Sequence, residues 1–290
     1  MEVAEVVARL GGTARTDQLR RIVSERDLAA AVRSGSVVRL ALGRYGLPSA
    51  DAAIVAATRL DGMVFGLSAA QELGWPVLRR ADRPWVQVPP NRNVAPHRRR
   101  GVRLGYGETE GRSVSSPLRT VLDCARRLPL TEALAVADSA LRSGTVDPDE
   151  LCSSANLARG PGSAQVAVVG REATPLAASP LESALRALGL GVPGLRLVPQ
   201  VELQVEGVTL HPDLLDERLG LVVEAEGWLY HGGPKQFARD LWRYTALTVS
   251  GRTVVRFGYD DVTLRPDWVT QCLDSLRRTG ERHRDCRQSA

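Results

Sequence analysis

The first 48 residues alternate short apolar stripes with glycine and polar breaks. Residues 2–10 have the spacing of an amphipathic helix. A second helix is expected from Thr16, and a third from Ser24, where the sequence comes close to a capping box. Alternating apolar positions between residues 36 and 48 then predict a two-stranded ribbon. Three short helices followed by a ribbon are typical of a winged helix-turn-helix.

Residues 49–152 predict a mostly helical connector domain of the α+β type. One helix, one strand and two further helices are expected near residues 67–74, 84–90, 116–128 and 130–144. Asp123 and Asp138 lie in the last two helices, each beside arginines, which favours ion pairs over a catalytic carboxylate pair. Residues 153–178 are rich in Gly, Ala and Ser and lack strong periodicity, so we expect a linker there that contains at most one weak helix.

Residues 179–290 begin with a strong helix start, Ser179-Pro180-Leu181-Glu182, which has an N-cap serine, a proline at the first helical position and a glutamate two residues later. Three strand-like runs follow and predict an antiparallel meander, and then a helix, a strand and a terminal helix from Pro266. This order favours a mixed sheet between helices. The chain as a whole is therefore expected to be a multidomain α/β (α+β) protein.

The composition excludes several classes of protein. The chain has 290 residues, of which 43% are hydrophobic and 24% charged, as in ordinary globular proteins and unlike disordered ones. No window has the roughly 20 apolar residues of a spanning helix, and the acidic N-terminus is unlike a signal peptide, so a cytoplasmic location is expected. The four cysteines form no CxxC pair, which argues against a zinc site or a disulfide framework.

The net charge of +5 is concentrated in the N-terminal third, where residues 1–110 hold 17 basic and 11 acidic side chains. This excess predicts contact with DNA, a polyanion. The third helix would enter a major groove, and the ribbon would touch phosphate or the minor groove. The expected DNA-binding residues are Arg26, Arg33, Arg39, Arg44 and Tyr45. The run Arg98–Arg100 beside His97 is either a phosphate contact or a solvated loop.

Three carboxylates in the C-terminal segment predict a metal site. Asp213 follows Pro212, and after ten intervening residues come Glu224 and Glu226, which project from one face of a strand. The neighbouring strand can bring Asp213 beside them. A cluster of acids next to buried valines is costly unless a cation neutralises it, and oxygen ligands suit Mg²⁺ or Mn²⁺. Such a metal assists phosphodiester hydrolysis.

Two families resemble parts of this chain. The segments "GGTARTDQL" and "GRYGLP" resemble the N-terminal winged helix of AbiEi-type antitoxins, which are transcriptional regulators. Pro-Asp, the ten-residue gap and Glu-x-Glu resemble the PD-(D/E)xK nuclease superfamily, and about 100 residues from Ser179 resemble its branch related to Vsr endonucleases. The matching segments include "EAEG" at 224–227, Asp240 with Arg243, and "VVRF" at 254–257.

The second resemblance implies a restriction-endonuclease-like mixed sheet flanked by helices. It also implies that Asp213, Glu224 and Glu226 hold metal, that Glu182 is an accessory acid, and that His231 places or deprotonates water. Glu182 could instead only cap its helix, and His231 could be structural. Glu226 departs from the pattern, because the superfamily usually has Lys there and this branch prefers Asp.

Two functions remain open at this point. The first is a DNA-binding, Mg²⁺- or Mn²⁺-dependent endonuclease with a nicking, repair or defence role. The second is a non-enzymatic transcriptional regulator or antitoxin whose nuclease-like domain is degenerate, with a toxin as partner. The oligomeric state is not predicted, and no membrane partner is expected.

Overall fold

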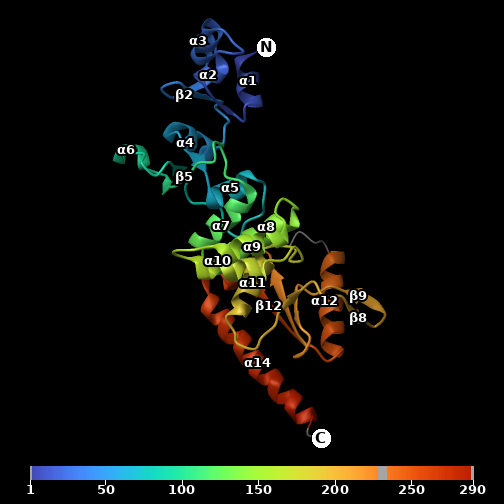
Figure 1. Ribbon diagram of the computed structural model, residues 1–290. Coiled ribbons are helices and arrows are strands. Elements are labelled where there is room, and N and C mark those ends of the chain that lie inside the picture. The colour runs from blue at the N-terminus through green and yellow to red at the C-terminus, as the bar shows by residue number, and fades with distance from the viewer. Residues whose placement is uncertain (1, 228–233, 289–290) are drawn as a thin grey trace. The chain divides into compact units, whose positions relative to one another are not determined.

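The computed structural model describes the backbone of residues 2–227 and 234–288. It confirms a mixed α/β chain and divides it into two compact units. Unit 1 consists of residues 1–74 and 80–123, and unit 2 of residues 75–79 and 124–290. Figure 1 follows the chain from the N-terminal helices to the long C-terminal helix. None of the helices in the described residues is both long and apolar enough to cross a membrane.

The N-terminal part of unit 1 is the expected winged helix. Its elements are α1 (Val3–Arg9), β1 (Thr13–Arg15), α2 (Thr16–Leu19), α3 (Glu25–Ser34), β2 (Val38–Ala41) and β3 (Arg44–Gly46). Ser24 caps α3 by accepting a hydrogen bond from the Asp27 backbone N–H, and Gly35 ends the helix with a left-handed backbone. The ribbon strands β2 and β3 pair with each other, and β1 adds a third antiparallel strand beside β3.

The rest of unit 1 surrounds a second small sheet with the strand order β4-β5-β6. Its elements are α4 (Ala52–Leu60), β4 (Met63–Val64), α5 (Gly66–Glu72), β5 (Trp85–Val88), α6 (Pro96–Arg99) and β6 (Arg103–Tyr106). The α4 helix buries its alanine-rich face against β4 and β5. The next helix, α7 (Pro117–Arg127), contributes residues to both units.

The linker expected at residues 153–178 is instead largely helical. After α8 (Leu130–Arg142), the chain forms α9 (Pro148–Leu157) and α10 (Ser163–Glu172). These two helices pack closely at Gly170. A Cβ placed there would lie only 2.3 Å from the Cβ of Ala155, so only glycine fits this contact. The small residues that indicated a linker therefore allow close helix packing.

The C-terminal part of unit 2 is a mixed sheet with the strand order β12-β11-β10-β7. Its elements are α11 (Pro180–Leu190), β7 (Val198–Pro199), β10 (Leu214–Asp216), β11 (Leu221–Glu226), α12 (Pro234–Val249), β12 (Thr253–Gly258), α13 (Tyr259–Leu264) and α14 (Pro266–Gln288). Strands β11 and β12 are parallel and are joined through α12, while the other pairs are antiparallel.

The predicted meander is split into two sheets. Strands β8 (Leu203–Val205) and β9 (Val208–Leu210) form a separate hairpin. Gln200, which has a φ of +55°, turns the chain between β7 and β8, and Pro212 lies in the break between β9 and β10. Both positions disfavour a continuous strand.

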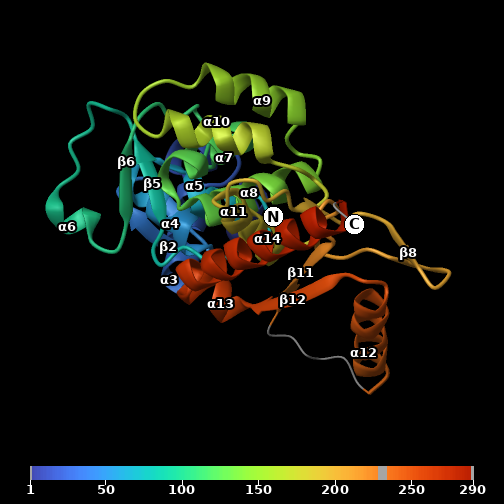
Figure 2. The same cartoon turned by 90° about the horizontal axis from the view of Figure 1, so that it is seen from below.

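Helices cover both faces of the four-stranded sheet, with α12 on the side opposite α11 and α14 (Figures 1 and 2). Leu221 and Val223 in β11 pack toward α11 and α14, whereas Val222 packs with Leu247 of α12. Because side chains alternate along a strand, Glu224 and Glu226 project to the α12 face.

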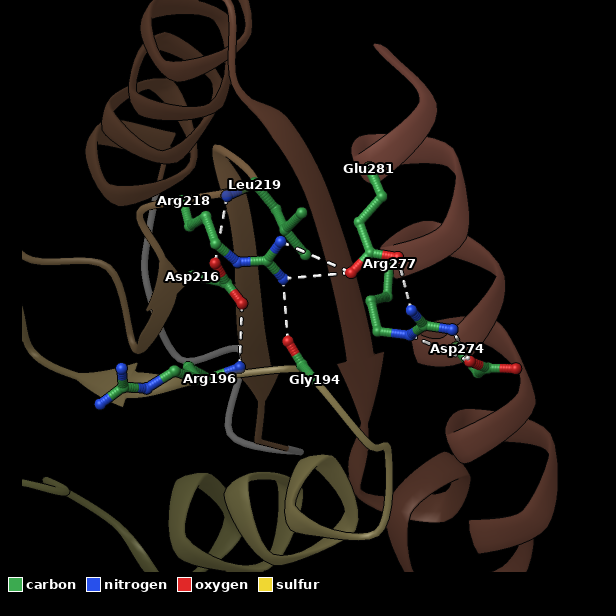
Figure 3. Close-up of polar contacts among 8 residues, drawn as sticks. All are labelled: Gly194, Arg196, Asp216, Arg218, Leu219, Asp274, Arg277 and Glu281. Carbon is green, nitrogen blue, oxygen red and sulfur yellow. Dashed lines mark hydrogen bonds and ion pairs between the residues drawn. The ribbon is translucent and has the colours of Figure 1, made fainter. Parts of the chain in front are cut away.

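Buried Asp216 fixes the turn between β10 and β11 (Figure 3). Its carboxylate accepts hydrogen bonds from the backbone N–H of Arg196 at 2.9 Å and of Leu219 at 3.1 Å. Asp216 thus has a structural role at the turn that joins β10 to β11.

Candidate metal and phosphodiester site

Asp213 lies next to Glu224 of β11. It directly precedes β10, whose pairing with β11 begins with Leu214 opposite Val223. Asp213 Oδ2 accepts a hydrogen bond of 2.8 Å from the backbone N–H of Ala225, which directs the aspartate toward β11. The charge of Asp213 is close enough to raise the pKa of Glu224, so the two carboxyl groups are neighbours.

Glu224 is only 2% exposed and forms an ion pair with Arg243 of α12. The Arg243 Nη2 atom lies 2.9 Å from Glu224 Oε1. Burial, followed by the negative charge of Asp213, raises the pKa of Glu224 to about 8, and Arg243 offsets only part of this rise. The pair of carboxyl groups therefore resists carrying two negative charges.

Glu182 of α11 joins the same cluster through Gln200. Its Oε2 atom accepts hydrogen bonds from the Ala178 backbone N–H at 2.9 Å and from Gln200 Nε2 at 3.0 Å. The same Gln200 nitrogen lies 3.5 Å from Asp213 Oδ1. Burial and the charge of Asp213 raise the pKa of Glu182. Glu182 thus stabilises the start of its helix and also belongs to the cluster, so the two expectations for it do not exclude each other.

Glu226 has a different set of partners. Arg256 of β12 forms an ion pair of 2.6 Å with it, and the Tyr244 hydroxyl donates a hydrogen bond of 2.7 Å. The Arg256 guanidinium also stacks over the Tyr244 ring at 4.2 Å. Burial, with the acceptor Glu226 beside it, raises the pKa of Tyr244. Glu226 is therefore neutralised by protein groups.

The three predicted ligands are not assembled into one site. Within residues 2–227 and 234–288, no group of three or more His, Cys, Asp or Glu side chains is arranged to hold a metal ion. Two carboxylates that repel each other, Asp213 and Glu224, do fit Mg²⁺, which proteins often hold with one or two carboxylates plus water and substrate phosphate. The donor set thus fits a two-carboxylate site, and the metal itself stays a prediction.

A cavity of about 410 Å³ opens beside these acids. Glu182 and Asp213 line it together with the apolar residues Leu78 and Leu181 and the ring of Tyr259. The Tyr259 hydroxyl donates to the Leu78 carbonyl at 3.2 Å, which fixes the wall of the cavity. Glu182 and Asp213 are therefore reached from this cavity, whereas Glu224 is not among its lining residues.

The predicted DNA-binding residues occupy two sides of the winged helix. Arg26, Arg33 and Arg39 are exposed. Tyr45 is half-buried against the winged-helix core, and Arg44, the preceding residue in β3, forms an ion pair with Asp61. His231 lies outside the described residues.

Sequence reasoning missed several residues that shape the site. Gln200 belongs to no sequence motif. What distinguishes it is its positive φ, which is visible in the structure and not in the sequence. Arg256 and Tyr244 were not predicted as partners of Glu226, although Arg256 lies in the quoted "VVRF" segment.

Sequence comparisons with known proteins place this chain in a family. The uncharacterized protein Rv2248 of Mycobacterium tuberculosis (strain ATCC 25618 / H37Rv) is 30% identical over 206 residues, which are 68% of this chain and 74% of that protein. The uncharacterized protein MT2308 of strain CDC 1551 / Oshkosh matches to the same extent. This chain belongs to the Rv2248 family.

Other comparisons add little to the Rv2248 family assignment. The crystal structure of Rv2827c from Mycobacterium tuberculosis has a TM-score of 0.35 and 15% identity, and the match covers 63% of this chain and 78% of that one. That likeness is too weak to define the fold. No profile of a known protein family matches the sequence. The function of this Rv2248 family member must therefore be argued from its own residues.

Proposed function

We propose that this protein is a DNA-binding endonuclease that hydrolyses phosphodiester bonds with the help of Mg²⁺ or Mn²⁺. The observation that carries the proposal is the neighbouring pair of carboxyl groups of Asp213 and Glu224, with Glu182 linked to Asp213 through Gln200 and a cavity beside Glu182 and Asp213. The resemblance of this segment to Vsr-related PD-(D/E)xK nucleases supports the same reaction. The winged helix would bring the chain to duplex DNA.

Each residue of the cluster has a separate task in this proposal. Asp213 and Glu224 would hold the metal, which supplies charge neutralisation at the phosphate and a more acidic water. Gln200 orients Asp213 and Glu182 by bonding to both. Arg243 fixes the rotamer of Glu224 from α12. His231 remains a candidate for placing water.

One observation favours the alternative function, a non-enzymatic transcriptional regulator or antitoxin. Arg243 neutralises Glu224 and Arg256 neutralises Glu226 without any metal. A degenerate nuclease domain would keep such pairs for stability while the winged helix represses a promoter, and a toxin would be its partner. The resemblance of residues 1–48 to AbiEi-type antitoxins agrees with this second candidate.

A plasmid assay separates the two functions. Supercoiled plasmid is incubated with the native protein in Mg²⁺, in Mn²⁺ and in a chelator, and nicked circles are measured over time. The nuclease proposal expects nicking in either metal, none in the chelator, and loss of nicking in Asp213→Asn. The matched control is Glu217→Gln, an exposed acid in the next turn. Native protein that leaves the plasmid intact in both metals would support the regulator.

A further inference from the structure

A cluster of arginines surrounds one carboxylate in unit 1. Asp61 follows α4 with a left-handed backbone, φ +54°, and its side chain is 36% exposed. Arg15 and Arg92 each lie 3.1 Å from it, and Arg44 of β3 forms a third ion pair. Three guanidinium groups on one carboxylate leave a local excess of two positive charges.

The Asp61 cluster separates two hollows in the surface of unit 1. One, of about 250 Å³, is also lined by Arg112, and the other, of about 480 Å³, by Arg59 and Arg98. Asp61 is the only acidic residue among those lining either hollow. Arg98 donates a hydrogen bond to the Arg59 carbonyl, so its position is fixed by the backbone. Together the two hollows form one strongly basic surface.

The arrangement suits phosphate oxygens. A guanidinium carries five N–H donors in a fixed fork, and Arg15, Arg44 and Arg92 each contact Asp61 through one terminal nitrogen. The carboxylate thus holds the side chains in place at a small cost in donors, which lowers the ordering entropy that opposes ligand binding. A planar fork held in this way favours bidentate phosphate contacts.

The basic surface continues the winged helix. Arg39 and Tyr45 line a separate hollow of about 470 Å³ together with Arg33 of α3. Arg44, one residue before Tyr45 in β3, projects to the other face of the ribbon, toward Asp61. The ribbon therefore has arginines on both faces, one toward α3 and one toward α4 and the segment around α6. Regularly spaced phosphates along a duplex match such an extended surface better than a single small anion does.

We propose that Arg59, Arg92, Arg98 and Arg112, which line the two hollows on either side of the Asp61 cluster, bind the phosphate backbone of duplex DNA next to the segment bound by the winged helix. This inference rests on the proposed DNA-binding function and extends it to residues 59–112. For the run Arg98–Arg100 the sequence allowed either a phosphate contact or a solvated loop. This inference assigns a phosphate contact to Arg98 of that run.

The test measures duplex binding by the full chain at several salt concentrations, using fluorescence anisotropy of a labelled 30-base-pair oligonucleotide. Each lost phosphate contact should lower the slope of log Kd against log salt by about 1. The double variant Arg92→Ala/Arg98→Ala should therefore lower the slope by about 2 and weaken binding at least fivefold. Arg59→Ala/Arg112→Ala, which removes two exposed arginines without touching Asp61, should act in the same direction.

The matched control is Arg80→Ala/Arg83→Ala, which removes the same charge from exposed positions of unit 1 outside both hollows. It should leave the slope unchanged. If the native chain and the control bind DNA while both hollow variants bind equally well, this inference is wrong and the proposed function stands. If the native chain itself does not bind duplex DNA, the proposed DNA-binding function is wrong, and this inference is wrong with it.

Discussion

Arg243 Nη2 lies 2.9 Å from Glu224 Oε1 and so connects α12 to the central strand β11. The carboxylate side chain is 3% exposed and the arginine side chain 24%. The same Arg243 nitrogen also donates a 2.9 Å hydrogen bond to the His211 carbonyl, just before Asp213. One side chain therefore fixes both the strand that carries Glu224 and the turn that carries Asp213.

Removing Arg243 should destabilise unit 2. Arg243→Ala leaves a buried carboxyl group without its cation, and we expect a loss of about 2 kcal/mol, below the roughly 3–5 kcal/mol of a fully buried pair because the arginine is partly solvated. Thermal unfolding in a chelator measures the change. Arg239→Ala, an exposed position on the same helix, should have almost no effect. Equal midpoints for the two variants would contradict a structural role for the pair.

The ion pair between Asp138 of α8 and Arg186 of α11 should contribute more to stability. Its side chains are 0% and 5% exposed, and Asp138 also accepts a hydrogen bond from the Thr174 backbone N–H at 2.8 Å. Asp138→Ala leaves the buried guanidinium of Arg186 without its carboxylate partner. We expect the free energy of unfolding, measured in urea, to fall by about 3–5 kcal/mol. Asp149→Ala at an exposed helix start is the control, with a loss of about 1 kcal/mol or less. Similar losses in the two variants would contradict the assignment.

Glu72 should make unit 1 less stable as the pH rises. Burial and the neighbouring carboxyl of Asp51, which also hydrogen-bonds to it, raise the pKa of Glu72 from 4.5 to about 7. The pKa of Glu72 is higher in the folded protein than in the unfolded chain. The protonated carboxyl therefore stabilises the folded state in full below pH 4.5, and this contribution is lost as the pH rises through about 7. Glu72→Gln keeps a neutral donor at every pH. The thermal midpoints of native and variant should agree near pH 4.5, and by about pH 8 the native midpoint should be lower; a constant difference would contradict the shift.

Glu226 should tolerate neither shortening nor neutralisation if the site is active. Glu226→Asp moves the carboxylate about one carbon–carbon bond away from Arg256 and Tyr244, which now hold it at 2.6 and 2.7 Å. Glu226→Gln keeps an acceptor for Tyr244 and loses the charge that pairs with Arg256. We expect both variants to nick plasmid more slowly than the native chain. Faster nicking by the Glu226→Asp variant would indicate a degenerate native site.

The sequence predicted local structure well and side-chain partners poorly. Ser24 and Ser179 gave the correct helix starts, because a cap depends only on near neighbours in the chain. The linker prediction failed because Gly170 reports close packing against Ala155, a contact between two helices that composition does not reveal. Asp123 and Asp138 do form ion pairs, but the partner of Asp138 lies 48 residues away.

In the candidate site, too, the sequence predicted some neighbours and missed the partners that come from distant elements. Asp213 was expected beside Glu224, and the two carboxyl groups lie close enough for the charge of Asp213 to raise the pKa of Glu224. Glu226 was expected to join them because it shares their face of the strand. Its actual partners come from α12 and β12, and only the packing of those elements determines which cation reaches it.

The central claim is that Asp213 and Glu224 form a two-carboxylate metal site. Isothermal titration calorimetry of the native chain with Mn²⁺ tests it most directly, beside Asp213→Asn and the exposed control Glu217→Gln. The account predicts saturable binding to the native chain and to Glu217→Gln, and loss of that binding in Asp213→Asn with the thermal midpoint of the apoprotein preserved. Absence of binding up to millimolar Mn²⁺, or undiminished binding in Asp213→Asn, would contradict it.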